Sequence, residues 1–202
     1  MTDLKDAAAA MTNGPKNRNT GRDNAAVKLL ALLVAAALVV YFSQEFSRNG
    51  GRIAAIWPLN AMLLAVMMRQ SRSHWPAILA TGALANLGVS FIMGDNGLRA
   101  IGLTGANLVE VYLCAHLLWR RDRVLDITRA RDLLSFGLAA GVAGPAVSAF
   151  IASAVLAQSA PFTDTLTTWY AADALAMLIF APALLVFSAP QTAALNQART
   201  SL

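Results

Sequence analysis

The sequence predicts an all-α integral membrane protein, a six-transmembrane-helix bundle with both termini in the cytoplasm. Hydrophobic residues make up 57% of the 202 residues and charged residues only 13%, against roughly 25% in a soluble domain. The mean hydropathy is +0.53, and the charges are concentrated between long apolar runs. These runs are too long for the strands of a membrane barrel, and they lack the alternation of apolar and polar residues that such strands show.

Six apolar runs divide the chain. A helix needs about 20 predominantly apolar residues to cross a bilayer, and the runs come close enough to that length to be read as spans. They cover residues 25–42, 53–68, 75–93, 101–119, 133–156 and 168–187. Residues 1–24 are polar and lack hydrophobic periodicity, so we expect a disordered cytoplasmic tail there. A six-span membrane domain over 25–187 and a short cytoplasmic tail over 188–202 complete the predicted organisation.

Lysine and arginine residues are enriched in alternate loops, which predicts the orientation of the bundle, because cytoplasmic loops carry an excess of these residues. The enriched segments are the N-terminal flank, the loops after the second and fourth runs, and the C-terminal tail, with Lys16, Arg18, Arg22, Lys28, Arg69, Arg72, Arg120, Arg121, Arg123, Arg129, Arg131 and Arg199. The other loops hold only Arg48, Arg52 and Arg99. Membrane orientation therefore accounts for the net charge of +5, and we expect the lipid bilayer, not nucleic acid, as a partner.

Prolines and glycines mark irregular points within the spans. The pairs Trp57–Pro58 and Trp75–Pro76 fit span boundaries, because proline is tolerated in a first helical turn and tryptophan favours the membrane interface. In the fifth run, the spacing of Gly137 and Gly141 predicts the close approach of another helix. Pro145 predicts a kink, because proline lacks an N–H group and clashes with the preceding turn.

Four polar side chains on four predicted spans lie at similar depth in the outer half of the bilayer. Counted from the outer span ends at ~1.5 Å per residue, all four lie about 8–10 Å deep; they are Asn60, Asn86, Asn107 and Asp173. Glu110 lies about one turn deeper and shares a helix face with Asn107 at a spacing of three residues. A carboxyl group within a span is costly and is by default a functional-site hypothesis.

Two tryptophans accompany these polar side chains. Trp169 lies four residues before Asp173, and Trp57 lies three residues before Asn60, so each pair shares a helix face. We therefore predict a ligand-binding or sensing pocket that opens outward, with an aromatic rim, an amide layer and a carboxylate floor. Such a pocket would suit cation binding or proton sensing. For each asparagine the alternative is a hydrogen bond that only joins helices, worth around 1 kcal/mol or less.

No catalytic or metal-binding motif is present in the sequence. It lacks Gly-x-Ser-x-Gly, the phosphate-binding Gly-x4-Gly-Lys-Ser/Thr pattern and His-Glu-x-x-His. His74 and His116 have no neighbouring metal ligands, and Cys114, the single cysteine, excludes an internal disulfide. We expect no enzymatic activity and no metal, and the sequence names no cofactor.

Short motifs nevertheless follow one another in an order that is similar to a known family. They are Ile56-Trp57-Pro58, Trp75-Pro76 with Ala85-Asn86, Gly105-Ala106-Asn107-Leu108-Val109-Glu110, Leu117-Leu118-Trp119-Arg120-Arg121, and Trp169 with Asp173-Ala174-Leu175 and Ala181-Pro182. The ordered set resembles the membrane-associated sensor family, first type (the MASE domains), which are membrane input modules of bacterial histidine kinases, diguanylate cyclases and phosphodiesterases. The sequence departs from the family pattern at Ala172 and Ala176, where glycine is usual, and at Asn60, where glycine is commoner.

The resemblance implies a sensory or interaction module in the bacterial inner membrane. Because residues 188–202 are too few for a kinase or cyclase domain, we expect the signal to reach a separate protein partner in the membrane or cytoplasm. Two alternatives stay open. One is a substrate-capture subunit of a small-molecule transporter, such as the six-helix vitamin-binding subunits whose contact helix has the small-residue spacing of Ala31 and Ala35. The other is a structural subunit of a membrane complex, in which the polar layer only joins helices.

Overall fold

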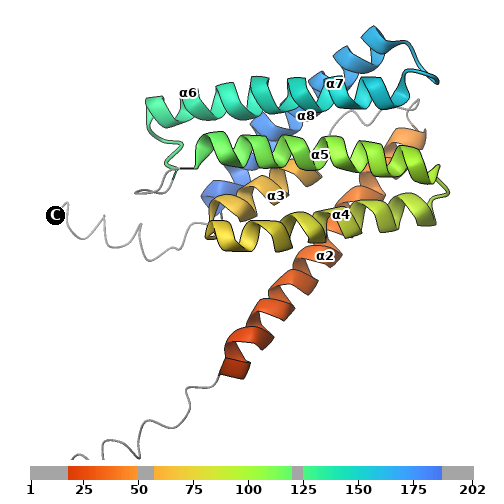
Figure 1. Ribbon diagram of the computed structural model, residues 1–202. Coiled ribbons are helices and arrows are strands. Elements are labelled where there is room, and N and C mark those ends of the chain that lie inside the picture. The colour runs from red at the N-terminus through yellow and green to blue at the C-terminus, as the bar shows by residue number, and fades with distance from the viewer. Residues whose placement is uncertain (1–17, 50–56, 120–124, 188–202) are drawn as a thin grey trace, which may run out of the picture.

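The computed structural model describes residues 18–49, 57–119 and 125–187, which form helices joined by short loops (Figure 1). The α-helices are α2 (Arg18–Asn49), α3 (Pro58–Met68), α4 (Trp75–Ile92), α5 (Gly97–Leu118), α6 (Ala130–Leu138), α7 (Gly144–Leu156) and α8 (Phe162–Phe187). A short 3-10 turn, Arg72–His74, precedes α4, and a π-helical turn, Ala139–Ala143, joins α6 to α7. The described residues contain no strand, so the all-α prediction is confirmed for them.

Five helical stretches are long and apolar enough to cross a membrane. They are Asn24–Phe46, Arg72–Ile92, Gly97–Leu118, Ala130–Leu156 and Phe162–Phe187. The second predicted span differs: α3 has 11 residues, about 16 Å at ~1.5 Å per residue, roughly half of a ~30 Å hydrocarbon core. The first part of that predicted span, residues 53–56, lies outside the described residues.

Several helices begin earlier than predicted. The α2 helix begins at Arg18, so residues 18–24 of the predicted tail are helical, whereas residues 1–17 and the predicted tail 188–202 lie outside the described part of the chain. The α5 helix begins at Gly97, because the Asn96 side chain accepts hydrogen bonds from the first backbone amides. The α8 helix begins six residues before Thr168.

Threonine hydroxyls are accommodated in the first turns of α8. Thr165 and Thr168 donate to the carbonyls of Pro161 and Asp164, four residues earlier, at 3.1 and 2.7 Å. These polar side chains are therefore satisfied by the backbone of their own helix, so a polar stretch can lie within it.

The short helix α3 lies inside the bundle. It packs against α8, α5, α4 and α2, and seven of its 11 residues are buried. In Figure 1 it lies between α4 and α5, beside the blue end of α8. The Trp75 indole at the start of α4 donates to the Met67 carbonyl at 3.0 Å, near the end of α3. An 11-residue apolar helix fits this environment, because protein surrounds it on most sides.

The irregularity predicted at Pro145 takes the form of the π-helical turn. Pro145 has no N–H group for the Gly141 carbonyl, and this carbonyl instead accepts the Tyr170 hydroxyl of α8 at 2.9 Å. The Ala139 carbonyl accepts the Gly144 N–H and the Cys114 thiol of α5, the latter at 3.2 Å. Side chains of α5 and α8 thus stabilise the wider turn.

Close packing of this helix depends on Gly144 and Gly141 rather than on Gly137. A Cβ at Gly137 would meet no other described part of the protein within 4 Å, so the prediction of a close helix contact there is wrong. A Cβ at Gly141 would lie 3.2 Å from Leu178. A Cβ at Gly144 would overlap the Cys114 sulfur and lie 3.2 Å from Cγ of Glu110. The spacing of glycines indicates a shared face, but the π-turn changes which residues meet α5.

We expect Gly144→Ala to destabilise the fold by about 1–3 kcal/mol, the usual cost of overpacking. Thermal unfolding in detergent micelles measures this effect. Gly137→Ala is the matched control; its methyl group meets open space, and alanine is the better helix former by up to about 1 kcal/mol. Removing the sulfur with Cys114→Ala should restore part of the loss. Equal stability of the two alanine variants would contradict the packing argument.

Candidate functional site

Polar side chains from four helices meet inside the bundle, and we call them the polar cluster. Its members are Asn60 of α3, Asn107 and Glu110 of α5, Ser148 of α7 and Asp173 of α8. Each is at most 2% exposed. Burial of polar groups is costly unless they are hydrogen-bonded, so the contacts among them fix the relative positions of the helices.

Asn60 connects α3 to α5. Its amide nitrogen donates to Oδ1 of Asn107 at 3.1 Å and to Oε2 of Glu110 at 2.8 Å. Asn60 lies in the first turn of α3, while its two partners lie one turn apart on α5. Asn107 and Glu110, predicted to share a helix face, thus both accept a hydrogen bond from the same amide group.

Ser148 connects α7 to α8. Its hydroxyl donates to Oδ2 of Asp173 at 3.1 Å and accepts the indole N–H of Trp169 at 3.0 Å. The carboxyl groups of Glu110 and Asp173 lie next to each other. This carboxyl pair joins the Asn60 half of the polar cluster to the Ser148 half.

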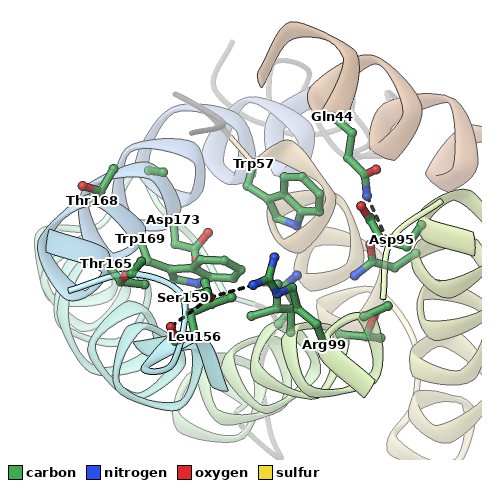
Figure 2. Close-up of a pocket in the computed structure, with 18 of the residues that line it drawn as sticks. Gln44, Trp57, Asp95, Arg99, Leu156, Ser159, Thr165, Thr168, Trp169 and Asp173 are labelled. Carbon is green, nitrogen blue, oxygen red and sulfur yellow. Dashed lines mark hydrogen bonds between the residues drawn. The ribbon is translucent and has the colours of Figure 1, made fainter. Parts of the chain in front are cut away.

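A cavity of about 800 Å³ adjoins the polar cluster, at the end of the bundle where α4 ends and α5 and α8 begin. Asn107 and Asp173 belong to both the cavity and the polar cluster, so they form the cavity floor. Figure 2 shows Trp57, Trp169, Asp173 and Arg99 directed into the cavity. The Arg99 guanidinium donates to the Ser159 hydroxyl at 2.6 Å.

The structure brings the predicted site residues together. Five of the seven line the cavity: Trp57, Asn86, Asn107, Trp169 and Asp173. Asn60 and Glu110 lie behind the floor, in the polar cluster. Asp173 is about 16 Å from the first residue of α8 at ~1.5 Å per residue. This is twice the depth of about 8 Å that was predicted from the span start, because α8 begins at Phe162 rather than at Thr168. Whether these residues bind a ligand stays a prediction.

Sequence reasoning missed several residues of this site. Ser148 was not predicted, although it lies four residues after Gly144 and therefore on the same helix face. Arg99 falls in a predicted loop, because the fourth predicted span begins only at residue 101. Gln44, Ser90 and Thr104 also line the cavity; Gln44 donates to Ser90 at 3.0 Å.

Several buried polar atoms of the site have no hydrogen-bond partner among the described residues. They are Oε1 of Gln44, Nε1 of Trp57, Oδ1 of Asn60, Oγ1 of Thr104 and Oε1 of Glu110. Leaving such an atom unpaired costs about 1–3 kcal/mol, and each case in a native protein calls for an explanation such as a ligand or an ordered water. The described residues hold no group of three His, Cys, Asp or Glu side chains that could bind a metal.

We expect Ser148→Ala to destabilise the protein by about 1–3 kcal/mol, because it removes a partner from both Asp173 and Trp169. Ser153→Ala is the matched control on the same helix. Ser153 is equally buried, but its hydroxyl donates only to the carbonyl of Ala149 at 2.7 Å. Thermal unfolding followed by tryptophan fluorescence would compare them, and equal losses would contradict the bridging role of Ser148.

Comparison with known proteins gives one family match. The family model MASE1 matches residues 27–196, a range that includes the polar cluster and the lining of the cavity. No curated protein and no solved structure matches the chain.

Proposed function

Because the chain belongs to the MASE1 family of membrane-associated sensor domains, we propose that it senses a small polar ligand in the cavity and acts through a partner protein. The family and the apolar helices make it a multi-pass membrane protein of signal transduction. One observation carries the proposal: a cavity of about 800 Å³ ends on the buried carboxyl group of Asp173 and lies beside unpaired polar atoms. Ligand sites commonly enclose roughly 300–1,000 Å³ and place a few polar groups among apolar walls.

The polar cluster gives a ligand a means to alter helix positions. A ligand shifts a conformational equilibrium only by binding one state better than another. A group that contacts Asp173 or Asn107 at the cavity floor would compete with the hydrogen bonds of Ser148 and Asn60. Those bonds join α7 to α8 and α3 to α5, so their rearrangement would move helices that continue to the opposite end of the bundle.

We place the cavity on the outer side of the bacterial inner membrane, with both termini in the cytoplasm. The loops after α3 and α5 lie at the end of the bundle opposite to the cavity, together with the end of α8 (Figure 1). These loops carry Arg69, Arg72 and Arg129, whereas the cavity end carries Arg99 and, near the end of α2, Arg48. The arginine bias supports this orientation through the positive-inside rule.

A substrate-capture subunit of a transporter would use the same cavity. The distinguishing measurement is uptake: loss of transport of one solute on deletion of the gene would favour capture, whereas an altered gene-expression programme with unchanged uptake favours sensing.

We expect Asp173→Asn and Glu110→Gln to lose most of the signalling output. The output is defined as the set of transcripts that change in a deletion strain, and each variant is tested for its ability to restore them. Asp126→Asn is the control, because it makes the same carboxyl-to-amide change in the surface loop before α6. If both site variants fold and restore the transcripts as wild type does, the cavity has no sensory role.

The orientation predicts which introduced cysteines an impermeant maleimide labels in intact cells. In a Cys114→Ala background, Leu98→Cys and Gln158→Cys at the cavity end should react. Gln70→Cys and Ala130→Cys should react only after permeabilisation. The reverse pattern would invert the orientation, and labelling at both ends in intact cells would contradict a membrane-spanning bundle.

A further inference from the structure

We propose that the cavity binds a small zwitterion of the amino-acid class, with its ammonium group toward Asp173 and its carboxylate toward Arg99. This inference rests on the proposed function, since it names the class of ligand for the same site. It follows from the separate placement of hydrogen-bond acceptors and donors around the cavity.

The floor of the cavity suits an ammonium group. Asp173 is 2% exposed and lies beside the second carboxyl group, that of Glu110. The Thr104 hydroxyl, which is 4% exposed and lines the cavity, has no hydrogen-bond partner among the described residues. An ammonium group presents three donors and no acceptor, so it matches these oxygens.

Two indole rings add to this preference. Trp169 is held beside Asp173, because both bond the Ser148 hydroxyl. Trp57 enters the cavity from the residue before α3 (Figure 2). Cations are attracted to the faces of tryptophan rings, and the attraction is stronger in a partly dehydrated site.

The upper part of the cavity suits a carboxylate. Arg99 is the only basic side chain among the described residues that line it. A guanidinium group has five N–H donors in a planar fork that matches a carboxylate, and the Arg99 guanidinium donates to the Ser159 hydroxyl. The Trp57 indole N–H has no partner among the described residues. It supplies a second donor, an uncharged one, for a carboxylate oxygen.

The remaining charges of the lining disfavour simpler ligands. Asp95 and Asp164 lie at the mouth, so the described lining carries three carboxyl groups and one guanidinium group. A plain anion would meet the carboxylates, whereas a plain cation would offer no negative group to pair with the Arg99 guanidinium. A zwitterion pairs with both signs, and Leu103 and Leu156 provide an apolar wall for its side chain.

The test uses the full chain in lipid nanodiscs and the proteinogenic L-amino acids as individual probes at millimolar concentration. Thermal stabilisation identifies a binder, and calorimetry gives its affinity. We expect at least one amino acid to bind. Its decarboxylated amine and its N-acetyl derivative should each bind at least 10-fold more weakly. No stabilisation by any amino acid would overturn the proposal.

Variants assign the two ends of the ligand. Arg99→Gln, a surface change that should not disturb folding, should weaken the binding of the amino acid at least 10-fold, while the affinity of the amine should stay the same or rise. Asp173→Asn should weaken both, and Arg129→Gln at the opposite end of the bundle is the charge-matched control. Equal binding of the amino acid and the amine, with no effect of Arg99→Gln, would overturn the assignment.

The two proposals can fail separately. If an amine binds without regard to Arg99 while Asp173→Asn abolishes the transcriptional output, the sensory role stands and the zwitterion assignment is wrong. If an amino acid binds as expected while both carboxyl variants restore the output, the zwitterion assignment stands and the sensory role is wrong.

Discussion

The burial of Glu110 and Asp173 side by side constrains the arrangement of the helices around them. Carboxyl groups at membrane depth are costly, and these two must be supplied with donors from within the protein. Asn60 donates to Glu110 and Ser148 donates to Asp173. Because the donors come from α3 and α7 and the carboxyl groups from α5 and α8, four helices have to converge at one level of the bundle.

Three backbone features make that convergence possible. The α3 helix starts at Pro58, which places Asn60 in its first turn. Gly144 lets α7 lie against Cys114 and Glu110. In the π-turn before it, backbone carbonyls accept hydrogen bonds from the side chains of Tyr170 and Cys114. Irregular backbone at membrane depth is tolerated where protein groups satisfy it, and π-turns of this kind are frequent at functional sites.

The helical class and most of the site residues could be predicted from the sequence, because apolar runs and spacings of three or four residues are local properties. Asn107 with Glu110, and Trp169 with Asp173, could be paired on this basis. Other features could not be predicted. The polar residues before Thr168 hide the start of α8, and Ser148 bonds Asp173 and Trp169 only because α7 meets α8. Gly137 and Gly144 differ through the π-turn, which moves the contact with α5 along the helix.

The contacts at the opposite end give a physical route from the polar cluster to the end of the bundle that lies away from the cavity. Arg69, just after α3, bonds the Leu185 carbonyl of α8, and Arg72 stacks 4.1 Å over Trp119 at the end of α5. The short helix α3 thus contacts α5 through Asn60 near its start, and the loop that follows α3 contacts α8 through Arg69 and the end of α5 through Arg72. A displacement of Asn60 at the start of this 11-residue helix would reach the loop that holds Arg69 and Arg72. The Asn60 amide nitrogen serves two acceptors while its oxygen has no partner among the described residues. Asn60 is therefore the residue of the polar cluster that could form an additional hydrogen bond, through its oxygen, in a second arrangement of the helices.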